Sequence, residues 1–204
     1  MPDDGLLTLV TQEYAVSRHY TPSDLVPLEE YIPADILLGY PIELRRVAAE
    51  PLRELINAMH AAELSPTVIS GYRSYAAQAI AWKKWVGLEP ERVAIISAQP
   101  GHSEHQLGTT VDFGSPELEE IVGQPDIEFH TYFYKTGEGV WLAEHAHEFG
   151  FVQSYPREAL ELTGFYYEPW HYRYVGVDLA AELHEAGITL TELLLERHGA
   201  PCIP

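Results

Sequence analysis

Apolar residues recur at helical spacing in five stretches of the chain. Residues 41–64 carry six of them near a 3.6-residue period, which predicts a helix that is kinked or restarted at Pro51. Ser74 is a suitable N-cap for a second, amphipathic helix that ends at Gly87. The tryptophans of this helix, Trp82 and Trp85, are expected in the core. Further helices are predicted over residues 139–150, 178–187 and 189–199.

Short β-prone runs separate these helices. Residues 67–69 are all β-branched or apolar, and residues 109–113, 151–156 and 165–177 combine β-branched and aromatic side chains with turn residues between them. Turns, and not crossover helices, join many of these runs. The pattern therefore predicts an α+β fold, in which a small central antiparallel sheet is flanked by helices in a single domain.

The first forty residues differ from the remainder of the chain. Residues 1–40 are rich in proline, tyrosine and acidic residues, and the prolines exclude a long helix. We predict an extended N-terminal arm over residues 1–40 that packs on a catalytic domain of residues 41–204. No glycine- and serine-rich linker and no internal repeat divides the chain.

Composition narrows the function classes. The chain of 204 residues has 12 basic and 31 acidic side chains, which gives a net charge of −19. Nucleic acids and anionic membrane surfaces are therefore poor partners, because both are bound through clustered lysine and arginine. Cys202 is the single cysteine, which excludes an intramolecular disulfide and a cysteine-based zinc site. No apolar run reaches the ~18 residues that predict a membrane-spanning helix.

The stretch GHSEHQLGTTVD, residues 101–112, brings two histidines and an aspartate close together. Gly108 lets the chain turn before the predicted strand, so that His105 and Asp112 can enter one pocket. Imidazole and carboxylate groups from separate segments are the usual protein ligands of catalytic zinc. His102 is an alternative ligand to His105 at this stage, and a solvated polar loop without metal is an alternative to a site.

A second histidine and acid pair lies in YYEPWHYRY. Glu168 and His171 are three residues apart, which in a regular strand would place them on opposite faces. Pro169 bends the backbone and can bring both side chains into one cavity. The aromatic surroundings would raise the pKa of Glu168 and suit it to general base catalysis. His171 alone is more simply explained as a packed core histidine. Trp170 is expected to form a wall of the site.

Three motifs, SGYRSYAAQ, PGHSEHQLGTTVD and EPWHYRYVG, occur in this order and resemble the VanY-type zinc D-alanyl-D-alanine carboxypeptidases. The family pattern is Ser-x-His, six residues, Asp, and further on Glu-x-x-His. The resemblance covers residues 66–176, about half of the chain, and implies a domain of the Hedgehog/DD-peptidase type. The chain departs from the family at Thr109 and Thr110 and at Ser154, which affects substrate choice and not the metal ligands.

The resemblance implies a role for each matching residue. One zinc ion would be held by His105, Asp112 and His171, with Glu168 as the base that activates the attacking water. Arg73 would polarise the scissile carbonyl and stabilise the oxyanion. Three further residues would bind the substrate: Gln78, Ser103 and Tyr155.

The implied substrate is a peptidoglycan stem peptide or its precursor, from which the C-terminal D-alanine is removed by D,D- or L,D-cleavage. The alternatives are an endopeptidase that cuts within the stem peptide, a zinc-binding module without catalysis, and a metal-free structural protein. Because peptidoglycan lies outside the cytoplasmic membrane, we expect a cell-envelope protein whose leader has been removed, with a cytoplasmic enzyme as the alternative. We expect a monomer.

Overall fold

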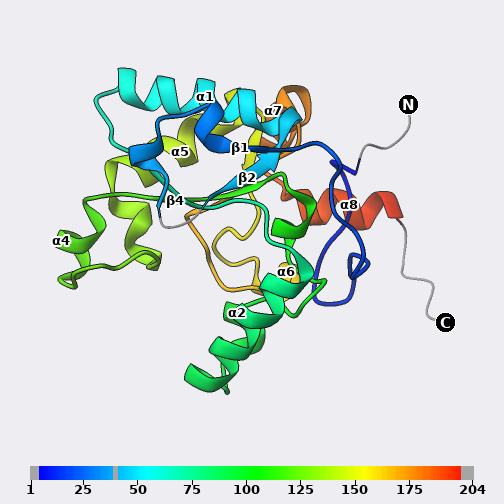
Figure 1. The fold of residues 1–204 in the computed structure, drawn as a ribbon. Helices are drawn as coiled ribbons and strands as arrows, with labels where there is room; N and C mark the ends of the chain where they lie inside the picture. The colour runs from blue at the N-terminus through cyan, green and yellow to red at the C-terminus, as the bar shows by residue number, and fades with distance from the viewer. Residues whose placement is uncertain (1–4, 39–40, 199–204) are drawn as a thin grey trace.

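The computed structural model describes residues 5–38 and 41–198, and it confirms the predicted α+β class. Within these residues the strands form two antiparallel sheets, a pair with the order β1-β2 and a four-stranded sheet with the order β3-β4-β6-β5 (Figure 1). The strands are β1 Leu25–Pro27, β2 Glu43–Arg45, β3 Thr67–Ser70, β4 Thr110–Gly114, β5 Phe151–Gln153 and β6 His171–Tyr174. Cys202 and Gly199 lie outside the described residues.

Helices lie before, between and after the strands. The α-helices are α1 Arg46–Ala61, α2 Tyr75–Leu88, α3 Val93–Ile96, α4 Leu118–Val122, α5 Gly137–His145, α6 Leu160–Thr163, α7 Val177–Ala186 and α8 Leu190–His198. The 3-10 helices are η1 Leu28–Glu30, η2 Ala34–Ile36, η3 Glu104–Leu107, η4 Thr131–Lys135 and η5 Ala146–Phe149. No helix among the described residues is both long enough and apolar enough to cross a membrane.

The central strand β4 separates the main core from the polar face of the sheet. Val111 and Phe113 are fully buried in the same cluster as the apolar face of α1, whereas Asp112 lies between them in the strand. Successive side chains of a strand point to opposite faces. Tyr172 of β6 joins the same core, so that its neighbour His171 shares the opposite face with Asp112.

Two of the predicted helices, α1 and α2, differ in part from the form that was predicted. The first begins only at Arg46, after β2, and continues through Pro51 without interruption. The second begins as predicted, because the Ser74 hydroxyl accepts a hydrogen bond of 3.2 Å from the Ala77 N–H. However, α2 is not amphipathic in its packing, since Gln78 is its only buried residue and Ile80 is 74% exposed. Figure 1 shows α2 projecting from the body of the molecule.

The N-terminal segment runs over the domain without regular structure. Residues 5–24 contain no helix or strand, and Leu9 packs in a small apolar cluster with residues of α7 and α8. The Val16 N–H donates a hydrogen bond of 2.7 Å to the carbonyl of Gly101, the first residue of the stretch that carries His105 and Asp112. The division into an arm of residues 1–40 and a domain of residues 41–204 stays a prediction.

Candidate metal centre

Asp112 and His171 meet because they are paired across two neighbouring strands. Asp112 of β4 lies opposite His171 of β6 in the antiparallel register. Directly opposite residues on one face have Cβ atoms only about 5 Å apart. The Oδ1 atom of Asp112 accordingly lies 3.1 Å from the Nδ1 atom of His171.

The third side chain, His105, comes from the 3-10 helix that precedes β4. Gly108 ends this helix with a φ of +70°, a left-handed conformation that glycine adopts without strain. The chain then enters β4, and the predicted turn is confirmed. His105 Nε2 lies 3.1 Å from Asp112 Oδ2, and the His105 and His171 rings are edge to face with centroids 5.0 Å apart.

Each imidazole is oriented through its other ring nitrogen. The Nδ1 atom of His105 lies 2.7 Å from the Gly71 carbonyl oxygen, which can only accept, so Nδ1 carries the proton. The Nε2 atom of His171 lies 3.1 Å from the Glu104 carboxylate. Hydrogen bonds of this kind fix the tautomer and the ring orientation of metal-binding histidines. They leave Nε2 of His105 and Nδ1 of His171 directed at Asp112.

The acceptor for His105 depends on a glycine. A Cβ atom at Gly71 would lie 2.5 Å from the Glu43 carbonyl oxygen and 2.7 Å from Cγ2 of Ile42. Such contacts are too short for a side chain, so the backbone can pass here only with glycine. The loop after β3 is thereby held against β2, with its carbonyl available to His105.

The three side chains have the donor set and the spacing of a metal site. One ligand atom from each residue lies within 4.8 Å of the others, and all three residues are buried. Asp112 Oδ1 is a buried oxygen without a hydrogen-bond partner, although it is close to His171. Two imidazole nitrogens and one carboxylate oxygen suit zinc and leave a fourth position for water. The residues therefore fit a single zinc ion.

Charge within the triad also favours a cation. Burial lowers the pKa of His105, which keeps this imidazole neutral. Burial opposes ionisation of Asp112 too, but the two histidines outweigh it and hold the pKa of Asp112 well below its usual range. For His171, burial is outweighed by the neighbouring carboxylates of Asp112 and Glu104, which raise its pKa to about 10. A metal ion bound to Nδ1 of His171 would replace that proton.

Glu104 and Arg173 support the site, and neither was identified from the sequence. Arg173 donates hydrogen bonds to the Glu104 carboxylate (2.7 Å) and to the carbonyl oxygens of Leu6 (2.7 Å) and Thr8 (2.8 Å). Burial would raise the pKa of Glu104, but the charge of Arg173 and the contact with His171 lower it to about 2. Glu104 therefore stays ionised and links the N-terminal segment, through Arg173, to His171.

Glu168 lies beside the metal ligands, as predicted. The His171 N–H donates to the Glu168 carbonyl oxygen at 3.2 Å, which closes a turn with Pro169 inside it. The turn brings Glu168 Oε2 to 3.5 Å from His171 Nδ1. Burial raises the pKa of Glu168 to about 7. The carboxylate can accordingly exchange a proton near neutral pH.

Arg73 is held by hydrogen bonds at the edge of the triad. Its guanidinium donates to Gln78 Oε1 at 2.9 Å and to Ser70 Oγ at 3.2 Å, and it lies 3.7 Å from Asp112 Oδ2. The Gln78 amide in turn donates to the Ala98 carbonyl oxygen at 2.6 Å. A fixed guanidinium so close to the triad can stabilise a negative charge that develops on a bound carbonyl.

One cavity of about 540 Å³ contains every residue that the sequence motifs assigned to the site. Tyr155 is buried, with its ring 4.7 Å from the ring of His171, and burial raises its pKa well above the usual value. The predicted position of Trp170 in the wall is confirmed, whereas Trp85 lines the cavity and does not lie in the core. The site residues in this cavity are Arg73, Gln78, Ser103, His105, Asp112, Tyr155, Glu168 and His171.

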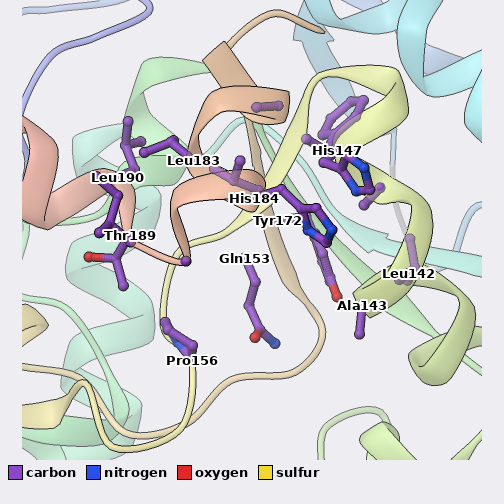
Figure 2. Close-up of a pocket in the computed structure, with 16 residues that line it drawn as sticks. Leu142, Ala143, His147, Gln153, Pro156, Tyr172, Leu183, His184, Thr189 and Leu190 are labelled. Carbon is purple, nitrogen blue, oxygen red and sulfur yellow. The ribbon is translucent and has the colours of Figure 1, made fainter. Parts of the chain in front are cut away.

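A second cavity, of about 260 Å³, lies between α5, η5, β5 and α7 and contains none of these residues (Figure 2). Thr189 and Leu190 lie across it from His147. The His147 and His184 rings stack with centroids 3.6 Å apart and planes at 4°. Among the described residues, the only group of three possible metal ligands is His105, Asp112 and His171.

Comparisons with known proteins agree with the resemblance that the motifs indicate. The sequence profile of the family VanY, D-alanyl-D-alanine carboxypeptidase, matches residues 41–177. The chain is 34% identical over 192 residues to the protein YodJ of Bacillus subtilis, which covers 93% of this chain and 67% of the relative. It is 32% identical over 194 residues to a D-alanyl-D-alanine carboxypeptidase of Enterococcus faecium, covering 93% of this chain and 57% of the relative.

Solved structures agree with the sequence matches. The LD-carboxypeptidase LdcB superposes with a TM-score of 0.80 at 32% identity, over 95% of this chain and 86% of LdcB. VanYB in complex with D-Alanine-D-Alanine gives a TM-score of 0.72 at 28% identity, over 93% of this chain and 97% of VanYB. A variant of the D,D-pentapeptidase VanY in complex with Zn(II) gives the same TM-score and identity, over 93% of this chain and 98% of that one.

Proposed function

Because the chain belongs to the VanY family of D-alanyl-D-alanine carboxypeptidases, we propose that it hydrolyses the last peptide bond of peptidoglycan stem peptides and releases the C-terminal D-alanine. The observation that carries this proposal is the convergence of His105, Asp112 and His171 with Glu168 in one cavity. The chain spans little more than half the length of the Enterococcus faecium enzyme.

The metal would be one zinc ion, held by His105 Nε2, Asp112 and His171 Nδ1. When bound, zinc lowers the pKa of water and polarises a carbonyl oxygen, which gives a nucleophile near neutral pH. The chain would orient its two histidine ligands through Gly71 and Glu104, so that little rearrangement accompanies binding. The Zn(II) complex of a related VanY supports the choice of zinc.

Glu168 would act as the general base. It accepts a proton from the attacking water and passes it to the nitrogen of the departing D-alanine. Its pKa of about 7, raised by burial, matches this double role near neutral pH, because a general base and acid works best with a pKa near the operating pH. Its Oε2 atom lies 3.5 Å from Nδ1 of the proposed ligand His171, which supports this role.

Arg73 would stabilise the negative charge that develops on the carbonyl oxygen as the water attacks. The hydrogen bonds from its guanidinium to Gln78 and Ser70 hold it in place before the substrate arrives. Electrostatic stabilisation is strongest when the donor needs no reorganisation during the reaction. Arginine is suited to this because it keeps its positive charge at every physiological pH.

The terminal D-alanine would occupy the inner end of the cavity, where Gln78, Ser103 and Tyr155 are each at most 5% exposed. A buried, polar end of this kind favours a free terminal carboxylate over a continuing peptide chain. This distinguishes the proposed carboxypeptidase from an endopeptidase, whose cleft has to be open on both sides of the metal.

The L,D reaction, in which D-alanine is removed from an L-centre, is a second candidate. It is favoured by one observation, the TM-score of 0.80 with the LD-carboxypeptidase LdcB. Both reactions would use the same metal, base and carbonyl-stabilising arginine, and they differ in the residue before the bond, which has a D-centre in one and an L-centre in the other.

Mass spectrometry of a purified stem pentapeptide and tetrapeptide, incubated with the protein, tests these proposals. We expect the pentapeptide to lose the mass of one alanine, a chelator to stop the reaction, and added zinc to restore it. Loss of alanine from the tetrapeptide would establish the L,D reaction. Two large fragments would instead indicate an endopeptidase, and unchanged peptides would contradict the proposed function.

The substrate also suggests where the protein acts. Peptidoglycan lies outside the cytoplasmic membrane, so we propose a cell-envelope protein, with the trimming of a cytoplasmic precursor as the alternative. Fractionation of cells that produce the natural protein separates the two. That the protein is a monomer stays a prediction, which light scattering can check.

A further inference from the structure

The cavity that holds the metal triad extends well beyond the space that a terminal D-alanine needs. Its volume of about 540 Å³ is within the usual range for whole ligands of drug size. The lining continues along α2 to Trp85 and, beyond the end of this helix, to Glu89 and Arg92, and it also includes Phe129 and Tyr166. If the proposed function holds, this outer part faces the acyl side of the peptide.

The length of the outer part of the cavity can be estimated from the geometry of α2. Gln78 and Trp85 are seven residues apart, close to two turns, so both lie on the same face of α2 and line the same cavity. Seven residues of helix rise about 10 Å, and an extended peptide advances by about 3.4 Å per residue. Trp85 therefore lies about three residues upstream of the bond that is cleaved, and Glu89 and Arg92, which follow α2 in the chain, continue the same lining.

Arg92 is a cation of this outer lining. Its guanidinium carbon lies 5.7 Å from the centre of the Tyr166 ring, and the Tyr166 N–H donates a hydrogen bond of 2.8 Å to the Ile95 carbonyl oxygen of α3. The ring and α3 thus place the guanidinium in the outer lining. Its ion pair with Glu89 has an N–O distance of 3.9 Å, and both side chains are about half exposed. An ion pair this long and exposed contributes little to stability, so Arg92 can exchange Glu89 for a better placed carboxylate.

Charge makes Arg92 the favoured partner of an anionic substrate. The chain has a net charge of −19, so a negatively charged peptide is repelled by most of the surface. The only two guanidinium groups in the described cavity lining are those of Arg73 and Arg92, and Arg73 is already engaged beside Asp112. Lys135 and Arg157 lie over tyrosine rings and are not part of the lining.

We propose that Arg92 is a specificity residue, which binds a carboxylate on the acyl side of the substrate, at the third residue before the cleaved bond or farther from it. Arginine is suited to this role because its planar fork can make two parallel hydrogen bonds to one carboxylate. The protein would then discriminate between stem peptides that carry a free carboxylate at this position and peptides in which it is amidated. This inference rests on the proposed carboxypeptidase function.

Two synthetic peptides test the proposal. They share a D-alanyl-D-alanine terminus and differ only in carrying free carboxylates or carboxamides at the third and fourth residues before the cleaved bond. We expect the wild-type protein to prefer the carboxylate peptide by about fivefold in kcat/KM, the upper range for a partly exposed ion pair. Arg92→Gln should remove the preference, and Arg92→Glu should reverse it. The preference should shrink in high salt.

Arg53→Gln is the matched control, because Arg53 is a half-exposed arginine on α1 whose guanidinium pairs with Glu50 and which is absent from the cavity lining. This variant should keep the wild-type preference. A wild-type protein that cleaves both peptides equally, or an Arg92→Gln variant that keeps the preference, would overturn the inference. Failure of the wild-type protein to release D-alanine from either peptide would instead overturn the proposed function.

Discussion

Histidines gather in two regions of this molecule, and only one of them forms a metal centre. His105 and His171 are buried on the polar face of the four-stranded sheet, where a carbonyl and a carboxylate each hold one ring nitrogen. His147 and His184 stack on the surface between η5 and α7, beside the second cavity (Figure 2). The number of histidines is the same, but their partners differ.

In the surface pair, no partner directs the ring nitrogens toward a shared point. His147 Nδ1 is buried without a hydrogen-bond partner, and the parallel rings present their faces to each other. The neighbouring His145 points its Nδ1 at Glu148, 2.8 Å away. In the metal centre, Asp112 lies 3.1 Å from both imidazoles. Proximity of histidines is therefore insufficient, and a site requires partners that aim their nitrogens at a common carboxylate.

The two regions should differ most when one histidine is removed from each. His171→Ala removes a predicted ligand and should reduce both the bound zinc and the release of D-alanine to background. His147→Ala should leave one zinc per chain and unchanged activity, because this residue lies outside the metal cavity. Plasma mass spectrometry of the metal and the D-alanine assay measure both. Equal zinc in the two variants would contradict the assignment.

The base can be removed without removing the metal. Glu168→Gln keeps the shape of the side chain but cannot accept a proton, so kcat should fall by about 10³-fold, within the usual range for general base catalysis. Zinc content should stay at one per chain, since Glu168 is not a proposed ligand. A variant with near wild-type kcat would refute the base assignment, and loss of zinc would make Glu168 a ligand instead.

In each region a glutamate contacts a histidine, and the two glutamates allow a matched pair of variants. Glu104→Gln weakens the acceptor of His171 and should lower zinc affinity by about 10- to 100-fold, the usual effect of such a supporting partner. Glu148→Gln makes the same change beside His145 and should leave zinc affinity unaltered. Competition with a chromophoric chelator measures both. If Glu104→Gln bound zinc as tightly as the wild-type protein, the supporting role would be wrong.

The stacked pair of His147 and His184 should have only a small effect on the pH dependence of stability. Burial, and the nearby charge of His184, lower the pKa of His147 in the folded protein. The unfolded chain then binds the proton more readily, so stability is complete above about pH 6.5 and declines as the pH falls through the lowered value. The pair is on the surface, so we expect a decrease in Tm of about 2 °C or less relative to His147→Gln. An increase in Tm at low pH, relative to His147→Gln, would contradict this expectation.

Part of the fold and most of the site follow from local sequence. The cap at Ser74, the turn at Gly108 and the bend at Pro169 are consequences of single residues, and the structure has all three. The register that pairs Asp112 with His171 is a different matter, because it depends on how two strands align over a distance of 59 residues. The motif order indicates that pairing only through the family resemblance.

The supporting residues were missed for a physical reason. Glu104 and Arg173 are charged side chains, which from sequence alone are expected at the surface. Here both are buried, because each neutralises the other and Arg173 also satisfies two carbonyl oxygens of the N-terminal segment. The position of Trp85 was missed for the opposite reason. Its helix projects from the body, so an apolar residue there has no core to enter and lines the cavity instead.

The central claim is that two imidazoles and one aspartate bind a single zinc ion. A crystal of the purified protein with zinc, measured above and below the zinc absorption edge, tests it most directly. We predict one anomalous peak, about 2.0–2.2 Å from His105 Nε2, an Asp112 oxygen and His171 Nδ1. A map without a peak there, or with its main peak at His147 and His184, would contradict the account.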